Sequence, residues 1–275
     1  MNVFVRRRFV GVSLTALAVI AAMVLAFGAA GSIAATGHTS GWTLFSVIVF
    51  LSAYRVRKAI PFLPLGTSAA WLQLHIYCAL LTMALFLLHA GPPLPTGIFE
   101  SVLAVLYLTV CLSGVVGLIM SRSFPARLTM LGNEVIFEQI PIVRQQLQTQ
   151  VEALVLTGNT DSQASAVAEF YRDRIRPYLL SHRDVMSHLT RGESARWHRL
   201  SRAIDDQRRY LNTDEQRVLD EVKDRVRQKH ELDTKYALQG ALKIWLFIHV
   251  PATWALLIFS VCHVVLVHAW SGGLP

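Results

Sequence analysis

Acidic side chains are almost missing from more than half of this sequence. Of the 18 Asp and Glu residues, 17 lie between residues 121 and 240, and Glu100 is the only one elsewhere. Basic residues follow the same division, since only seven of the 26 Lys and Arg residues lie outside that segment. In a chain that is 53% hydrophobic and 16% charged, this uneven distribution excludes an ordinary soluble domain. The composition predicts a membrane protein.

The charged segment also lacks the motifs of nucleotide and flavin sites. Residues 122–240 contain no cysteine, only four glycines, and no dinucleotide fingerprint, P-loop or Cys-x-x-Cys pair. A flavin or NAD site in this chain is therefore not expected. The three cysteines, Cys78, Cys111 and Cys262, lie in apolar stretches. We interpret them as small apolar residues and not as disulfides or a metal site.

Five apolar stretches are candidates for spans, each of which needs about 20 residues to cross a bilayer. They are residues 9–30, 41–55, 70–90, 97–120 and 241–269, of which the second is the shortest. The first also fits a secretion signal, even a twin-arginine one, because MNVFVRRRFVG precedes an apolar run with small residues. Its apolar part is long for a signal, about 22 residues, and further spans follow, so we favour a retained span.

The basic residues outside the charged segment predict the orientation. With alternating spans all of them fall on one side: Arg6, Arg7, Arg8, Arg55, Arg57, Lys58 and Lys243. The opposite loops, GSIAATGHTS and AGPPLPTG, and the tail SGGLP contain no Lys or Arg. By the positive-inside rule the basic side is cytoplasmic. We expect a multi-pass protein of a bacterial inner membrane, with its N-terminus inside and its C-terminus outside. The net charge of +8 belongs to the membrane part, so no nucleic-acid partner is expected.

Residues 122–240 are predicted to form a cytoplasmic helical insert. Heptad-like apolar positions recur in VIFEQIPIVRQQLQTQVEALVL and in DEQRVLDEVKDRVRQKHELDTKYALQGAL, as in amphipathic helices. Breaks are expected near Gly158, Ser181 and Gly192. The alternating charges of this segment indicate a solvated helical surface, with a docking site for a partner as the alternative.

The last helix of the insert has a clear predicted start and no predicted stop. Asn212 or Thr213 is the expected N-cap, and nothing breaks the pattern before the last span. The predicted fold class is therefore all-α: an integral membrane helical bundle of about five spans with a cytoplasmic insert. Residues 1–121 hold spans one to four, and residues 241–275 hold the fifth span and the outer tail.

Two of the predicted spans carry histidines at the same spacing. His75 and His89 lie in the third span, His249 and His263 lie in the fifth, and each pair is 14 residues apart. Fourteen residues make about four helical turns and rise about 21 Å, so each helix presents two imidazoles on one face. The third and fifth spans run parallel, which places His75 level with His249 on the cytoplasmic side and His89 level with His263 on the outer side.

Imidazoles facing each other at two depths fit two metal centres with axial ligation. Haem b requires only two axial ligands from the protein. Zinc needs four protein ligands, or three and a water, and the two levels are too far apart to share one ion. The alternative is hydrogen-bonded packing of the four histidines, which the repeated spacing makes less favoured. We therefore predict two haem b groups, whose iron is ligated by His75 and His249 and by His89 and His263.

Several small and polar residues are expected near these histidines. Ser113, Gly114 and Gly117 give the fourth span a low surface, which suits either a flat cofactor or ordinary helix packing. Of the other histidines, only His38 and His268 lie near the outer level. Glu100, in the first turn of the fourth span, is a candidate catalytic residue that accepts a proton from a quinol. Its alternative role is that of an anion favoured by a helix N-terminus.

The paired histidines resemble those of di-haem membrane cytochromes b, which include the quinone-linked cytochrome b of bc-type complexes and ferric-reductase-like membrane domains. The placement on the third and fifth spans is similar to the reductase type, and the equal spacing is similar to the bc type. The resemblance implies two parallel helices that carry stacked bis-histidine haems. This chain departs from those families because it has no sixth span, no flavin domain in cis and no PEWY-like quinol-oxidation motif.

The resemblance implies a haem-containing subunit of an oxidoreductase complex. We expect it to carry electrons across the lipid membrane between quinone and a redox partner, such as a multihaem cytochrome, an iron-sulfur protein or a flavoprotein. One alternative is a ferric-reductase-like component fed by a separate flavoprotein. The other is a non-redox membrane scaffold whose cytoplasmic helices recruit partners.

Overall fold

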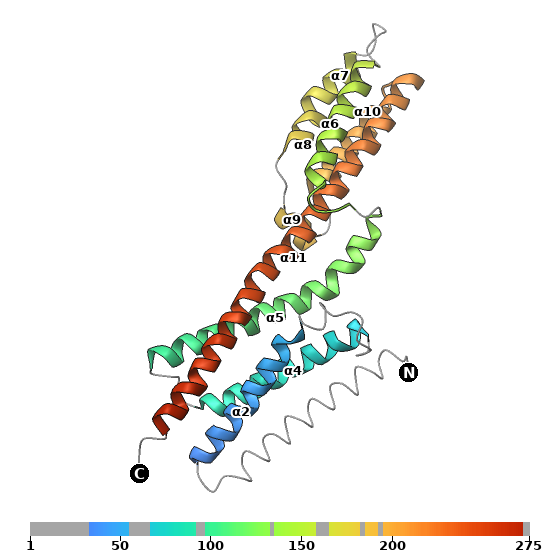
Figure 1. Cartoon of the computed structure of the whole chain (residues 1–275). Coiled ribbons are helices and arrows are strands. Elements are labelled where there is room, and N and C mark those ends of the chain that lie inside the picture. The colour runs from blue at the N-terminus through green and yellow to red at the C-terminus, as the bar shows by residue number, and fades with distance from the viewer. Residues whose placement is uncertain are drawn as a thin grey trace, which may run out of the picture. The chain divides into compact units, whose positions relative to one another are not determined.

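The computed structural model describes residues 33–54, 67–91, 97–132, 135–157, 165–181, 185–191 and 195–271. Within these ranges every regular element is a helix (Figure 1), as the all-α prediction requires. The elements are α2 Ile33–Ser52, α4 Ser68–Ala90, α5 Ile98–Met130, α6 Ile140–Thr157, α7 Ser165–Phe170, the π-helix η2 Tyr171–Ile175, α8 Arg176–Leu180, α9 Val185–Arg191, α10 Ala195–Arg208 and α11 Thr213–Ser271.

Three of the described helices are long and apolar enough to cross a membrane: α4, α5 and α11. They cover three of the five predicted spans, residues 70–90, 97–120 and 241–269. Most of the predicted span 41–55 lies on α2, which begins earlier, at Ile33, and ends at Ser52. The sequence TGHTSG in the N-terminal half of α2 is polar, and α2 is not among the candidate spans. The predicted span 9–30 lies outside the described residues, so five spans are not shown.

The helix ends follow from local chemistry. The Thr67 hydroxyl accepts from the Ala70 amide at the start of α4, and Gly91 ends that helix with φ 59°, a conformation that favours glycine. Asn212 caps α11 in a reciprocal arrangement, since its Oδ1 accepts from the Glu215 amide at 2.9 Å and its own amide donates to the Glu215 carboxylate at 3.0 Å. This capping box satisfies two N–H groups of the first turn.

The predicted helix borders in the insert are confirmed. Of the two candidate caps, Asn212 is the N-cap, and α11 continues without a break into the last predicted span, past Pro251. Helices α6, α8 and α9 end at Thr157, Leu180 and Arg191, next to the predicted breaks.

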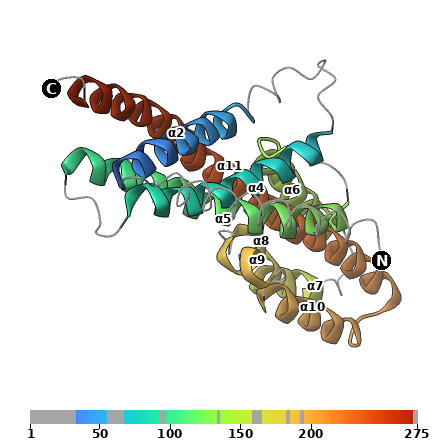
Figure 2. The same ribbon diagram turned by 90° about the horizontal axis from the view of Figure 1, so that it is seen from below.

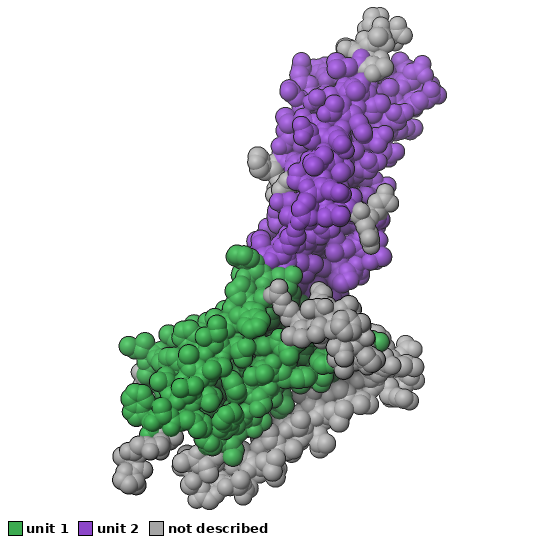
Figure 3. All heavy atoms as spheres, viewed as in Figure 1, with its two compact units in different colours: residues 1–119, 245–275 green, residues 120–244 purple. Residues whose placement is uncertain are grey.

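The chain divides into two compact units (Figure 3). Unit 1 consists of Met1–Ile119 and Trp245–Pro275, and unit 2 of Met120–Ile244. Helices α5 and α11 therefore contribute to both units.

Unit 1 has a small apolar core and an apolar exterior. Its core joins α2, α4, α5 and α11 through Leu44, Ile48, Leu85, Tyr107 and Leu256. Large apolar side chains point away from this core, for example Leu87, 71% exposed, and Leu112, 68% exposed. Apolar side chains of this number on the outside of helices are typical of contact with lipid and not with water. The fold of unit 1 is that of a helical membrane protein.

Unit 2 has the core of a water-soluble helical bundle. Helices α6, α8, α10 and the first part of α11 appear side by side in Figures 1 and 2. Their apolar faces and that of η2 meet at fully buried residues, among them Val151, Ile175, Ile204, Leu219 and Val222. The opposite faces carry exposed charges such as the Arg208–Asp220 pair. This alternation is the amphipathic pattern that the sequence predicts.

The end of α8 is held by buried charges. Lys229 is 2% exposed, and its ammonium group lies 2.6 Å from the Asp233 carboxylate. It also donates to the Tyr178 carbonyl at 3.1 Å, while Arg144 donates to the Leu179 carbonyl at 3.1 Å. The last carbonyls of a helix have no partner within the helix, so these two cations satisfy them. Asp233 balances part of the buried positive charge.

Candidate functional site: four histidines in unit 1

His89 on α4 and His263 on α11 lie face to edge in unit 1. Their ring centroids are 6.2 Å apart, and their planes make an angle of 86°. An imidazole nitrogen lies about 2 Å from a bound metal ion and about 1 Å from its own ring centre, so two imidazoles on opposite sides of one ion have centroids about 6 Å apart. The observed separation therefore matches axial ligation of a single ion.

The hydrogen bonding of His89 determines which nitrogen is available. Its Nδ1 lies 3.1 Å from the Gly37 carbonyl oxygen of α2. A carbonyl only accepts, so the proton belongs on Nδ1 and the lone pair on Nε2. Metal-binding histidines commonly have a second-shell acceptor of this kind, which sets the tautomer and the ring orientation.

Gly41, one turn along α2, makes room for the same ring. A Cβ atom at this position would lie 2.7 Å from Cε1 of His89, closer than side-chain atoms approach each other. The sequence interpretation missed both glycines. The signal that points to them is their spacing, Gly-x-x-x-Gly, which is typical of close helix approach in membranes.

His249 has an equivalent arrangement at the other level. Its Nδ1 lies 2.7 Å from Oγ of Ser113 on α5, and that hydroxyl donates to the Val110 carbonyl at 2.9 Å. Because the Ser113 proton is used in this way, Oγ accepts from Nδ1 of His249. Nε2 of His249 therefore carries the lone pair, as in His89.

Trp245 stabilises the His249 ring from one side. The two rings stack with centroids 5.3 Å apart and planes 21° apart, and the indole N–H donates to the Ser113 carbonyl at 2.7 Å. The indole lies so close to Gly117 that a Cβ there would be 2.1 Å from Cζ2. Of the two uses that the sequence left open for Gly117, the structure shows helix packing.

His75 on α4 lies near His249. The two rings are close enough for an electrostatic interaction, and the His75 ring also lies 5.1 Å from the Tyr54 ring. Nδ1 of His75 is buried and has no hydrogen-bond partner among the described residues. A buried imidazole is a poor apolar packing group, because an unsatisfied polar atom carries a desolvation cost.

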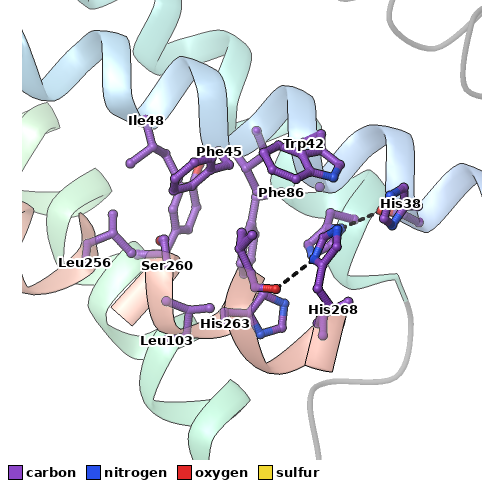
Figure 4. Close-up of a pocket in the computed structure, with 17 residues that line it drawn as sticks. His38, Trp42, Phe45, Ile48, Phe86, Leu103, Leu256, Ser260, His263 and His268 are labelled. Atoms are coloured by element: carbon purple, nitrogen blue, oxygen red, sulfur yellow. Dashed lines mark hydrogen bonds between the residues drawn. The ribbon is translucent and has the colours of Figure 1, made fainter. Parts of the chain in front are cut away.

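A cavity of about 290 Å³ lies next to the His89–His263 pair (Figure 4). Its size is near the lower end of the range of ligand cavities, about 300–1,000 Å³. Its lining comes from α2, α4, α5 and α11 and is mostly apolar. Ile48, Phe45 and Leu256 lie at one end in Figure 4, and His38 and His268 lie at the other. We call this space the His89–His263 cavity.

Glu100 lies in the first turn of α5. Its carboxylate folds back toward Gly97, where a Cβ would be 2.8 Å from Oε2, and Glu100 does not belong to the described lining of the His89–His263 cavity. This position suits an anion at a helix N-terminus, and a proton-accepting role stays a prediction. The neighbouring residue Phe99, which the sequence interpretation did not consider, stacks on the His263 ring at 6.3 Å.

Among the described residues, no group of three or more His, Cys, Asp or Glu side chains is placed to hold a metal ion. Two imidazole ligands suit an iron ion whose other four positions are filled by a porphyrin, and they are too few for a structural zinc site.

Comparison with known proteins gave no relative: no family model, no curated protein and no solved structure matches this chain. The fold and the apolar helices define the class, an all-helical membrane protein.

Proposed function

We propose that this protein is a di-haem b cytochrome that carries electrons across a membrane. The observation that carries the proposal is the geometry of His89 and His263, with ring centroids 6.2 Å apart and Nδ1 of His89 directed to the Gly37 carbonyl. His75 and His249 are the ligands of the second haem in this proposal. The haems supply one-electron chemistry, and the protein supplies ligands, orientation and an apolar surrounding.

The residues around the histidines set the properties of each site. At one level the Gly37 carbonyl holds His89, and at the other the Ser113 hydroxyl holds His249. Acceptors on Nδ1 make an imidazole a stronger ligand and lower the reduction potential of its metal. One acceptor is a backbone carbonyl and the other is a hydroxyl. We therefore expect the two haems to differ in reduction potential.

Because the two levels are far apart, electron transfer between the proposed haems moves charge across the membrane. Fourteen helical residues separate the histidines on each helix, about 21 Å. An electron that crosses a membrane potential of 100 mV exchanges about 2.3 kcal/mol with the field. With the orientation predicted from the basic residues, His75 and His249 lie on the cytoplasmic side of a bacterial inner membrane in this proposal. Quinone and a separate redox protein are the proposed donor and acceptor.

A haem assay on purified protein tests the proposal. We expect about two haem groups per chain by the pyridine haemochrome method, and a reduced visible spectrum of the b type with two imidazole ligands. His198→Ala, an exposed histidine of unit 2, should leave the haem content unchanged. A protein without haem and without iron by elemental analysis would overturn the proposal and leave a membrane scaffold as the function to test.

A further inference from the structure

Helix α9 is held in unit 2 by a single buried side chain. Among the side chains of α9 that the structure describes, His188 alone is buried, 3% exposed, while Val185 is 37% and Met186 73% exposed. The described apolar core of unit 2 takes residues from α6, α7, η2, α8, α10 and α11 but none from α9. An imidazole is a titratable anchor, because histidine changes its charge between about pH 5 and 8.

A second buried histidine lies against this anchor. The rings of His188 and of His230 on α11 have centroids 5.1 Å apart and planes 45° apart, and His230 is 7% exposed. Trp197 of α10 stacks on the His230 ring, with centroids 5.3 Å apart and planes 11° apart. Three helices therefore meet at His188, His230 and Trp197, which we call the α9 ring cluster.

The hydrogen bonding of His188 fits its neutral form. Its Nδ1 lies 3.0 Å from Oγ1 of Thr234, and the hydroxyl of Thr234 donates to the His230 carbonyl at 3.0 Å. Because the hydroxyl proton is used in this way, Oγ1 accepts from Nδ1 of His188. This bond needs one proton on Nδ1, and a second proton, on Nε2, would add a buried positive charge.

Cations face the α9 ring cluster from two helices. Arg127 of α5 donates to carbonyl groups of α9, among them that of His188. Lys229 precedes His230 on α11, and its ammonium group lies 4.2 Å from the centroid of the Tyr178 ring. The Tyr178 hydroxyl in turn lies 3.5 Å from Nδ1 of His230. Both cations would repel a protonated imidazole.

The described anions near the cluster are already paired. The Asp233 carboxylate lies 2.6 Å from the Lys229 ammonium group and 3.9 Å from Nε of Arg144, and Glu231 pairs with Arg227 at 3.3 Å. The other charged or titratable neighbours in the sequence are Arg196 and His198, which are exposed, and Lys235, 5% exposed. Protonation of both imidazoles would therefore add charge to a buried region that is already positive.

We propose that α9 is a pH-sensitive latch, held to unit 2 while His188 and His230 are neutral and released when they are protonated. Once α9 leaves, both imidazoles meet water and take up protons below about pH 6.5, whereas the buried pair does so only at lower pH. The latched state therefore binds fewer protons, so its stability is present at neutral pH and is lost as the pH falls below about 6.5. The latch is independent of the haem sites, and its failure leaves the proposed function as it is.

Hydrogen exchange of the full chain at several pH values tests the latch. After correction for the intrinsic pH dependence of amide exchange, the protection of α9 should fall at least about tenfold between about pH 7.5 and 5.5, since one proton taken up on opening changes the equilibrium by up to about tenfold per pH unit. Peptides from α6, whose core residue Val151 is 0% exposed, should keep their protection. Loss of protection in α6 as well, or no loss in α9, would overturn the inference.

A double variant removes the titratable groups and keeps their contacts. In His188→Asn the side-chain amide donates to Oγ1 of Thr234 in place of Nδ1, and His230→Phe retains a ring that stacks on Trp197. With both changes α9 should have equal protection at the two pH values, whereas His198→Ala, at an exposed histidine, should behave as wild type. A double variant with the wild-type pH dependence overturns the inference. If it holds α9 at neither pH, the two single variants decide, because each should lower the slope of protection against pH, and unchanged slopes overturn the inference.

Discussion

The orientation of single side chains supports the proposed ligand site. His89 and His249 each direct Nδ1 to an oxygen acceptor, and in both cases the acceptor comes from a different helix. A ring held in this way presents Nε2 in a defined direction. Ligand sites depend on such support, because the first ligand is only as well placed as the groups around it.

Gly41 gives the most direct residue-level prediction. In Gly41→Ala the new Cβ would lie 2.7 Å from Cε1 of His89, so the ring cannot keep its present position relative to His263. We expect the haem content to fall from about two per chain toward one, since one ligand site is displaced. Gly37→Ala is the matched control, because a Cβ at Gly37 meets nothing within 4 Å among the described residues. Equal haem loss in both variants would count against the geometry.

Ser113 should set the potential of one haem. In Ser113→Ala Nδ1 of His249 loses its acceptor, the imidazole becomes a weaker donor to iron, and the oxidised state loses stabilisation. The reduction potential of that haem should rise, and a tenfold change in relative stability corresponds to about 60 mV for a one-electron couple. An optical redox titration measures the shift, and Ser113→Thr, which keeps the hydroxyl, should stay near wild type. A shift of both haems, or of neither, would contradict this assignment.

At the level of elements, α4 and α11 are the two ligand helices of the proposed haem sites, and α2 and α5 support them. Helix α2 provides the Gly37 carbonyl and the space at Gly41, and α5 provides Ser113 and the groove at Gly117 that receives Trp245. Small residues allow the helices to approach closely, and close approach places backbone and hydroxyl oxygens within reach of the imidazoles.

The pairing of ligand helices predicts a pattern of non-additivity. His89→Ala should lower the haem content from about two to about one, and adding His263→Ala should cost no further haem, because both variants empty the same site. Adding His75→Ala instead should remove both haems. Haem analysis of the three single and two double variants shows which histidines share one haem site. Independent losses for His89 and His263 would show that these residues serve different sites.

The buried charges at the end of α8 predict a large effect in unit 2. Asp233→Asn leaves Lys229 and Arg144 without their shared anion in a buried position, which costs about 3–5 kcal/mol in comparable cases. Hydrogen exchange of the full chain should show lost protection in α8 and the neighbouring part of α11. Asp220→Asn, in an exposed pair with Arg208, is the control and should cost less than about 1 kcal/mol. Similar losses in both variants would argue against the importance of burial.

At the scale of the whole molecule, the chain combines two units whose surfaces differ in polarity. Unit 1 exposes apolar helices, while unit 2 has a buried apolar core and charged exterior faces. Helices α5 and α11 run from one unit into the other without a break. We expect unit 2, with its charged exterior, to lie in water. The basic residues next to the apolar stretches predict that it lies on the cytoplasmic side.

Protease accessibility tests that orientation. In right-side-out membrane vesicles residues 158–164 of unit 2, which follow α6, should be protected, and in inverted vesicles a protease should cut there. A tag at the C-terminus should show the reverse, because that end is predicted to lie outside. Cleavage of unit 2 in intact vesicles of the first kind would reverse the assignment of both ends.

The sequence by itself determined the all-α class, the helix borders at Asn212 and near Gly158, and three of the apolar helices, because periodicity, caps and hydropathy are local properties. The four histidines and their equal spacing can also be read from the sequence alone. Only the tertiary structure placed the Gly37 carbonyl on His89, the Ser113 hydroxyl on His249 and the His38 and Trp42 rings beside His268. These contacts join residues between 52 and 230 positions apart, and helix periodicity does not specify which face of one helix meets which face of another. The role of Gly117 was open for the same reason, since packing alone decides that Trp245 fills its groove.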